Sequence, residues 1–117
     1  MNTLITLDYE LFFGNNSGTA GNCILKPTEK LLAVLDQYNV KATFYVDVGY
    51  LSRADELRCD QASTSLVKKQ LCKLIEQGHD IQLHIHPHWE RSSLENGSWV
   101  FDLAYYKLSD FSEQEAS

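Results

Sequence analysis

Short apolar runs alternate with amphipathic segments along the first 90 residues of the chain. Residues 3–8, 40–46 and 80–84 are predicted to be strands, because they are short and rich in apolar or β-branched residues. Between them, residues 27–39 and 62–77 repeat apolar side chains at helical spacing. This alternation predicts βαβ units with a parallel sheet, which is an α/β fold.

The connecting stretches carry weaker patterns. Residues 9–26 contain several glycines and asparagines and predict a long loop, and residues 47–51 predict a loop or a short turn. Asn96 and Gly97 predict a tight turn before an apolar segment at 98–101.

The end of the chain predicts the start of another helix. Residues 112–115 have the sequence Ser-Glu-Gln-Glu, which is typical of a capping box. Because the chain ends at Ser117, we expect residues 1–117 to form a partial domain that is truncated at its C-terminal side.

Composition narrows the class of protein. A chain of 117 residues with 44% hydrophobic residues suits one globular domain, and its net charge of −6 argues against a nucleic-acid partner. No apolar run approaches the roughly 20 residues that span a bilayer, and the N-terminus lacks the basic region of a signal peptide. Cys23, Cys59 and Cys72 are odd in number and widely spaced, which argues against a disulfide framework. We therefore expect a cytoplasmic protein.

The candidate chemistry lies in two clusters that follow predicted strands. Asp8 and Glu10 follow the first strand, while His84, His86 and His88 place three imidazoles within five residues after the third. Imidazole is a common ligand of zinc and related metals. In parallel α/β folds the C-terminal ends of the strands form the active site, so both clusters are expected at one edge.

Spacing alone leaves the choice of imidazoles open. In an extended chain His84 and His86 point to the same side, about 6–7 Å apart, whereas His84 and His88 meet only if the chain curls. Pro87 biases His86 toward an extended conformation, so geometry slightly favours the pair His84 and His86. Asp8 and Glu10 share a face if their strand persists, so one could bind the metal while the other accepts a proton.

Other polar and aromatic residues have simpler explanations. Asp47, also at a strand end, is expected to cap a helix or to bind a loop by hydrogen bonds. His79 is expected to be structural, and Trp89 and Trp99 are expected in the core.

Three segments together resemble the polysaccharide deacetylases, also called the NodB-homology fold or carbohydrate esterase family 4. They are Leu4–Asp8, Lys41–Val46 and Gly78–His88, in the order of the first half of that domain. The resemblance implies the first half of a distorted (β/α) barrel. It also implies a hydrolase that removes N- or O-acetyl groups from carbohydrate with a divalent metal, which we expect to be zinc.

The resemblance also implies roles for single residues. Asp8 matches the catalytic base, and His84 and His88 match the two imidazole ligands, against the slight geometric preference for His86. Tyr9 stands where the family has its metal-binding Asp, so Glu10 is expected to take that role.

Two alternatives remain open at this stage. One is a different hydrolase of the amidohydrolase type, with His84 and His86 as a His-x-His pair. The other is a non-catalytic fragment, because the later motifs of the family, including a late general-acid His, have no counterpart after Trp89. Because that general acid is absent, we expect the 117-residue chain alone to be poorly active or inactive even if it carries the base and the metal ligands. Its unpaired strand edges could promote self-association.

Overall fold

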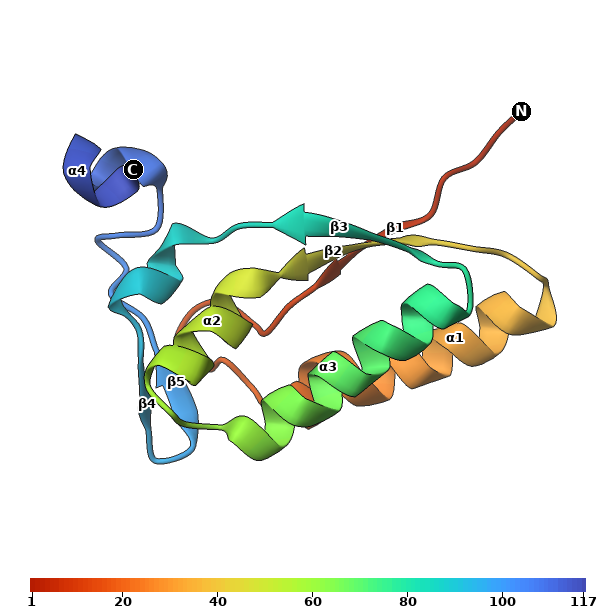
Figure 1. Ribbon diagram of the computed structural model, residues 1–117, viewed down its shortest axis with the longest axis horizontal. Helices are drawn as coiled ribbons and strands as arrows, with labels where there is room; N and C mark the ends of the chain where they lie inside the picture. Colours follow the sequence, from red (N-terminus) through yellow and green to blue (C-terminus); the bar gives the residue numbers. More distant parts are fainter.

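The computed structural model describes all of residues 1–117 and contains the expected parallel sheet. Its strands β1 (Thr6–Tyr9), β2 (Thr43–Asp47) and β3 (Asp80–His84) lie side by side in sequence order (Figure 1). Thr6 is level with Thr43, which is level with Asp80. The three strands therefore begin together, and their C-terminal ends meet at one edge of the sheet.

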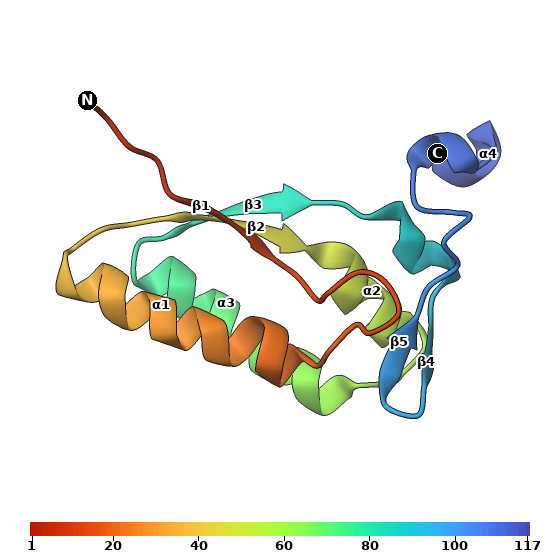
Figure 2. The same ribbon diagram turned by 180° about the vertical axis from the view of Figure 1, so that it is seen from behind.

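Both long helices cover the same face of this sheet. A short π-helix, η1 (Gly21–Leu25), runs directly into α1 (Lys26–Gln37), and α3 (Gln61–Glu76) lies beside it. Figures 1 and 2 show α1 and α3 along one face of the three strands, while the other face carries no helix and the short C-terminal helix lies beyond the strand ends. Sequential strand order with both crossovers on one face is the arrangement that a (β/α) barrel repeats, whereas a doubly wound sheet reverses it. These three strands are compatible with part of a barrel wall and do not close a barrel.

The core between sheet and helices fixes the ends of the strands. Phe44 and Val46 of β2 are 1% and 4% exposed and face the helices. Tyr9 of β1 donates a hydrogen bond to Oε1 of Gln70 on α3 at 2.8 Å, and the Gln70 amide donates to the Leu25 carbonyl at 3.0 Å. The end of β1, where the acidic cluster begins, is therefore tied to both helices.

The prediction of a loop at residues 47–51 was wrong. A helix, α2 (Val48–Glu56), begins directly after β2, and its first turn is capped by the Asp47 carboxylate, which accepts from the Gly49 amide at 3.2 Å. Tyr50 and Ala54 of α2 are 1% and 0% exposed, so tertiary burial compensates for poor local helix signals. The predicted loop at 9–26 was also too long, because its last six residues are helical.

The C-terminal third packs against the edge where the strands end. A 3-10 helix, η2 (Pro87–Arg91), leads into the hairpin of β4 (Ser93–Glu95) and β5 (Ser98–Val100). The turn predicted at Asn96 and Gly97 is present, and both residues have positive φ angles, 49° and 77°. A second 3-10 helix (Leu108–Asp110) precedes α4 (Glu113–Ala116), which has the predicted capping box.

The two tryptophans join this C-terminal part to the core, as expected. Trp89 is 2% exposed and Trp99 is 3% exposed, and their rings meet edge to face at 5.0 Å. None of the helices is both long and apolar enough to cross a lipid bilayer.

Candidate metal centre

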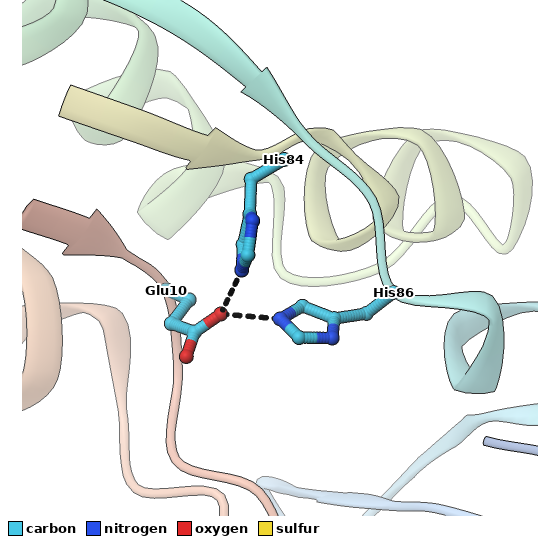
Figure 3. A group of neighbouring side chains, drawn as sticks. All are labelled: Glu10, His84 and His86. Carbon is cyan, nitrogen blue, oxygen red and sulfur yellow. Dashed lines mark hydrogen bonds and ion pairs between the residues drawn. The ribbon is translucent and has the colours of Figure 1, made fainter. Parts of the chain in front are cut away.

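Three polar side chains converge at the edge where the strands end. Oε2 of Glu10 lies 3.2 Å from Nε2 of His84 and 2.5 Å from Nε2 of His86. Figure 3 shows the carboxylate between the two rings, with Glu10 coming from the segment after β1 and both imidazoles from the end of β3 and the residues after it. One ligand atom from each of the three lies within 4.8 Å of the others.

The local backbone explains why these two imidazoles face the same side. His84 is the last residue of β3, and His86 keeps an extended backbone with φ −117° and ψ 109°. Residues two apart in an extended chain point to the same side, and the two ring centroids are 4.4 Å apart. Pro87 then begins η2 and ends the extended run.

His88 lies near this group and does not belong to it. The side chain is 4% exposed and packs between Phe13 and Phe101, with ring centroids 4.7 and 4.6 Å away. Burial lowers the pKa of His88 to about 4, and the nearby His86 adds to the effect. His88 is thus a neutral imidazole in an aromatic pocket, 5.1 Å from His86 between ring centroids.

Asp8 also lies outside the three-residue group. It is exposed, lies level with Tyr45 of β2, and precedes Glu10 by two residues, with Glu10 directly after the end of β1. The spacing of an extended chain places its Cβ about 6–7 Å from that of Glu10, on the face of the sheet that no helix covers. A carboxylate at that distance can reach a water molecule or substrate held beside Glu10.

Asp47 is a buried carboxylate directly behind the group. It is 4% exposed and accepts from the Trp89 indole at 2.6 Å and from the Gly49 amide at 3.2 Å. Burial raises the pKa of Asp47, while the Trp89 hydrogen bond and the charge of His86 oppose the rise and Glu10 adds to it. The sequence predicted that Asp47 either caps a helix or forms hydrogen bonds to a loop, and in the structure it caps α2. The contact with Trp89 had no signal in the sequence.

His79, which was predicted to be structural, forms a buried hydrogen bond to the backbone. It is 8% exposed, and its Nδ1 accepts a hydrogen bond from the Ala42 amide at 3.1 Å. Burial lowers its pKa, with the charge of Lys41 adding to the effect. His79 lies at the opposite end of β3 from the candidate site.

The donor set of the group fits a catalytic zinc centre. Zinc binds imidazole nitrogen at about 2.0–2.1 Å and carboxylate oxygen at about 2.0–2.2 Å, so ligand atoms on a tetrahedral ion lie roughly 3.4 Å apart. The distance between Glu10 and His84, 3.2 Å, is already close to this value. Oε2 of Glu10 and Nε2 of His86 are 2.5 Å apart, so these two atoms would have to separate by roughly 1 Å for both to bind the same zinc ion. Two imidazoles and one carboxylate leave a fourth position open, as catalytic zinc sites do.

A cavity lies beside the group formed by Glu10, His84 and His86, with His86 in its wall. Its volume is about 270 Å³, and it lies between α2, η2 and the C-terminal segment. His86 forms part of its wall, together with Val48, Leu108 and Phe111. The site thus combines a cluster of ligand atoms with an adjacent, partly apolar cavity.

Comparison with known proteins identifies the family of the chain. Residues 20–106 of its 117 residues match the polysaccharide deacetylase family, a range that includes all three clustered imidazoles and begins after Glu10. Neither the curated proteins nor the solved structures gave a match. Because the match covers well over half of the chain, this protein belongs to the polysaccharide deacetylase family.

Proposed function

We propose that this chain is a metal-dependent hydrolase that removes N- or O-acetyl groups from a carbohydrate, with zinc as the expected metal. The observation that carries the proposal is the convergence of Glu10, His84 and His86 at the C-terminal edge of a parallel sheet. Family membership supports the substrate class, because the match includes the segment that supplies both imidazoles.

The proposed metal ligands are Glu10, His84 and His86. The spacing typical of the family instead pairs His84 with His88, so the two ligand sets differ in one imidazole only. The contacts favour His86, since its Nε2 already meets the Glu10 carboxylate whereas the His88 ring is enclosed by aromatic side chains.

Each residue of the site has its own role in the proposed hydrolysis. The bound metal ion would polarise the acyl carbonyl and lower the pKa of a water molecule. Glu10, His84 and His86 would hold that ion, and the cavity beside His86 would accept part of the sugar. Asp8, on the open face beside Glu10, would accept the proton that the attacking water releases. It would return that proton to the sugar nitrogen or oxygen as the bond to the acyl carbon breaks, so that acetate and the free sugar group leave.

The direct test is acetate release from an acetylated amino-sugar oligomer, by protein depleted with a chelator and by the same protein reloaded with zinc. We expect acetate release, at a low rate, only after reloading. Asp8→Asn should lower turnover by about 10²–10⁴-fold, the usual contribution of a general base, and leave zinc affinity unchanged. Asp80→Asn is the matched control, because Asp80 is an exposed carboxylate at the other end of the same sheet. Acetate release without metal, or equal loss in both variants, would contradict the proposal.

One alternative has its own structural support. The pairing of His84 and His86 on Glu10 is a His-x-His arrangement, which also suits a metal-dependent hydrolase of the amidohydrolase type. N-acetylated amino acids separate the two functions. Their hydrolysis in the absence of activity on amino-sugar oligomers would favour the alternative, while zinc binding with no hydrolysis of either would indicate a non-catalytic domain.

A further inference from the structure

A buried carboxylate lies at the end of the middle strand, between the strand ends that carry Glu10 and His84. Asp47 ends β2 and is level with His84 of β3. On the other side, Tyr9 is level with Val46, so continuing this register by one residue places Glu10 level with Asp47. Asp47 therefore lies between two proposed ligands, and it is 4% exposed.

The Asp47 carboxylate joins two elements through its two oxygens. Oδ1 accepts from the Gly49 amide at the start of α2, at 3.2 Å. Oδ2 accepts from Nε1 of Trp89 in η2, at 2.6 Å. A buried indole N–H needs an acceptor, and Asp47 supplies it.

The residue whose indole Asp47 holds is connected to His86 through its backbone. The Trp89 amide donates to the His86 carbonyl at 3.3 Å, so these two residues form one turn of η2. Packing restrains the same indole on other sides: the Tyr50 ring lies 5.6 Å away and the Trp99 ring 5.0 Å away, between centroids. Arg53 of α2 also donates twice to the carbonyl of Ser92, which follows η2 directly.

We propose that Asp47 is a positioning residue, which holds the His86 imidazole against Glu10 by fixing Trp89 and the turn that connects them. This role rests on the proposed metal centre, and it goes beyond capping α2. Residues that orient metal ligands typically change metal affinity by 10–100-fold when they are substituted.

Asp47→Ser separates positioning from capping. Serine caps helices about as well as aspartate, but its hydroxyl is too short to reach the Trp89 indole. If Asp47 only caps α2, zinc affinity stays at the wild-type value. If Asp47 positions His86, zinc affinity falls by about 10–100-fold. Trp89→Phe removes the donor of the same hydrogen bond and should lower zinc affinity by a similar factor, with less than additive loss in the double variant.

Tyr50→Phe is the matched control. Tyr50 is buried beside Trp89 and donates to Asp60 at 2.7 Å, so this variant also loses one buried hydrogen bond to a carboxylate. It should lose stability comparably and keep zinc affinity. An equal loss of affinity in Tyr50→Phe and Asp47→Ser would show that general destabilisation explains the effect, and would overturn the inference.

The dependence on His86 provides the second test. In a His86→Gln background, Asp47→Ser should cause no further loss of zinc affinity, because its effect passes through that imidazole. A full additional 10-fold loss in this background would overturn the inference.

A metal-free measurement keeps this inference separate from the proposed function. In the apoprotein, Asp47→Ser should shift the ring ¹H and ¹⁵N resonances of His86 and leave those of His79 in place. Wild-type protein that binds no zinc would contradict the proposed function, and unchanged His86 resonances in Asp47→Ser would contradict the positioning role in either case.

Discussion

Gly49→Ala is a single-methyl change whose effect follows from the packing of Trp89. Gly49 is the second residue of α2, and a Cβ built there would lie 2.4 Å from Cδ1 and 2.8 Å from Cγ of the indole. Carbon atoms in contact are normally about 3.5–4.0 Å apart, so either the ring or the helix has to move by roughly 1 Å. The ring is 2% exposed and is held by Asp47, which leaves it little room.

Two effects on stability oppose each other in this variant. Replacing glycine by alanine within a helix stabilises the fold by about 0.5–1 kcal/mol, through backbone entropy. Adding a methyl group to a well-packed interior costs about 1–3 kcal/mol. The overlap at Gly49 is severe, so we expect a net loss of about 1–2 kcal/mol, or a decrease in Tm of roughly 4–8 °C for a domain of this size.

Thermal and urea unfolding measure the loss, and Gly21→Ala is the matched control. Gly21 begins the π-helix, has no positive φ, and a Cβ there would meet nothing closer than 3.8 Å. That variant should keep or raise Tm. We also expect Gly49→Ala to weaken zinc binding, because a displaced Trp89 shifts the turn that carries His86. A Gly49→Ala protein as stable as Gly21→Ala, with unchanged zinc affinity, would refute this description of the packing.

Three further predictions concern the core and its pH dependence. Tyr9→Phe leaves the buried carbonyl oxygen of Gln70 without its donor and should reduce the free energy of unfolding by about 1–3 kcal/mol in urea titrations. Leu74→Ala, at a fully buried site, should cost about 2–5 kcal/mol, whereas Ile75→Ala on the exposed side of the same helix should cost far less in the same assay. His88 has a pKa of about 4 in the fold against 6.5 as its ordinary value, so the unfolded chain binds more protons between these values. Stability should therefore fall as the pH decreases from about 6.5 to 4, and His88→Gln should flatten that part of a Tm-against-pH curve.

The strands and the two long helices could be predicted because their local patterns agree with their packing. The segment at residues 80–84, in which Ile81 and Leu83 alternate with polar residues, became β3 with the same bounds, and the parallel order followed from the alternation of strands and helices. Helix α2 was missed because its first residues, Val48 and Gly49, are poor helix formers. Its stability comes from burying Tyr50 and Ala54 against segments distant in the sequence, which no local pattern reveals.

Local patterns also predicted only part of the candidate site, because some of its geometry depends on residues distant in the sequence. The period of an extended chain was enough to place His84 and His86 on one side, and the structure has them there. The surroundings of His88 depend on Phe13 and Phe101, which lie far from it in the sequence. The chain turns at Pro87, and which imidazole then faces Glu10 depends on these long-range contacts rather than on spacing.

Zinc titration of the apoprotein by calorimetry tests the proposed centre most directly. We predict one zinc ion per chain, and a loss of affinity of more than 10-fold in Glu10→Gln, His84→Gln and His86→Gln, since loss of a ligand exceeds loss of its supporting contacts. His79→Gln removes an imidazole far from the site and should bind zinc as the wild type does, and so should His88→Gln. Wild-type protein that binds no zinc, or ligand variants that bind it as tightly as His79→Gln, would contradict the proposed metal centre.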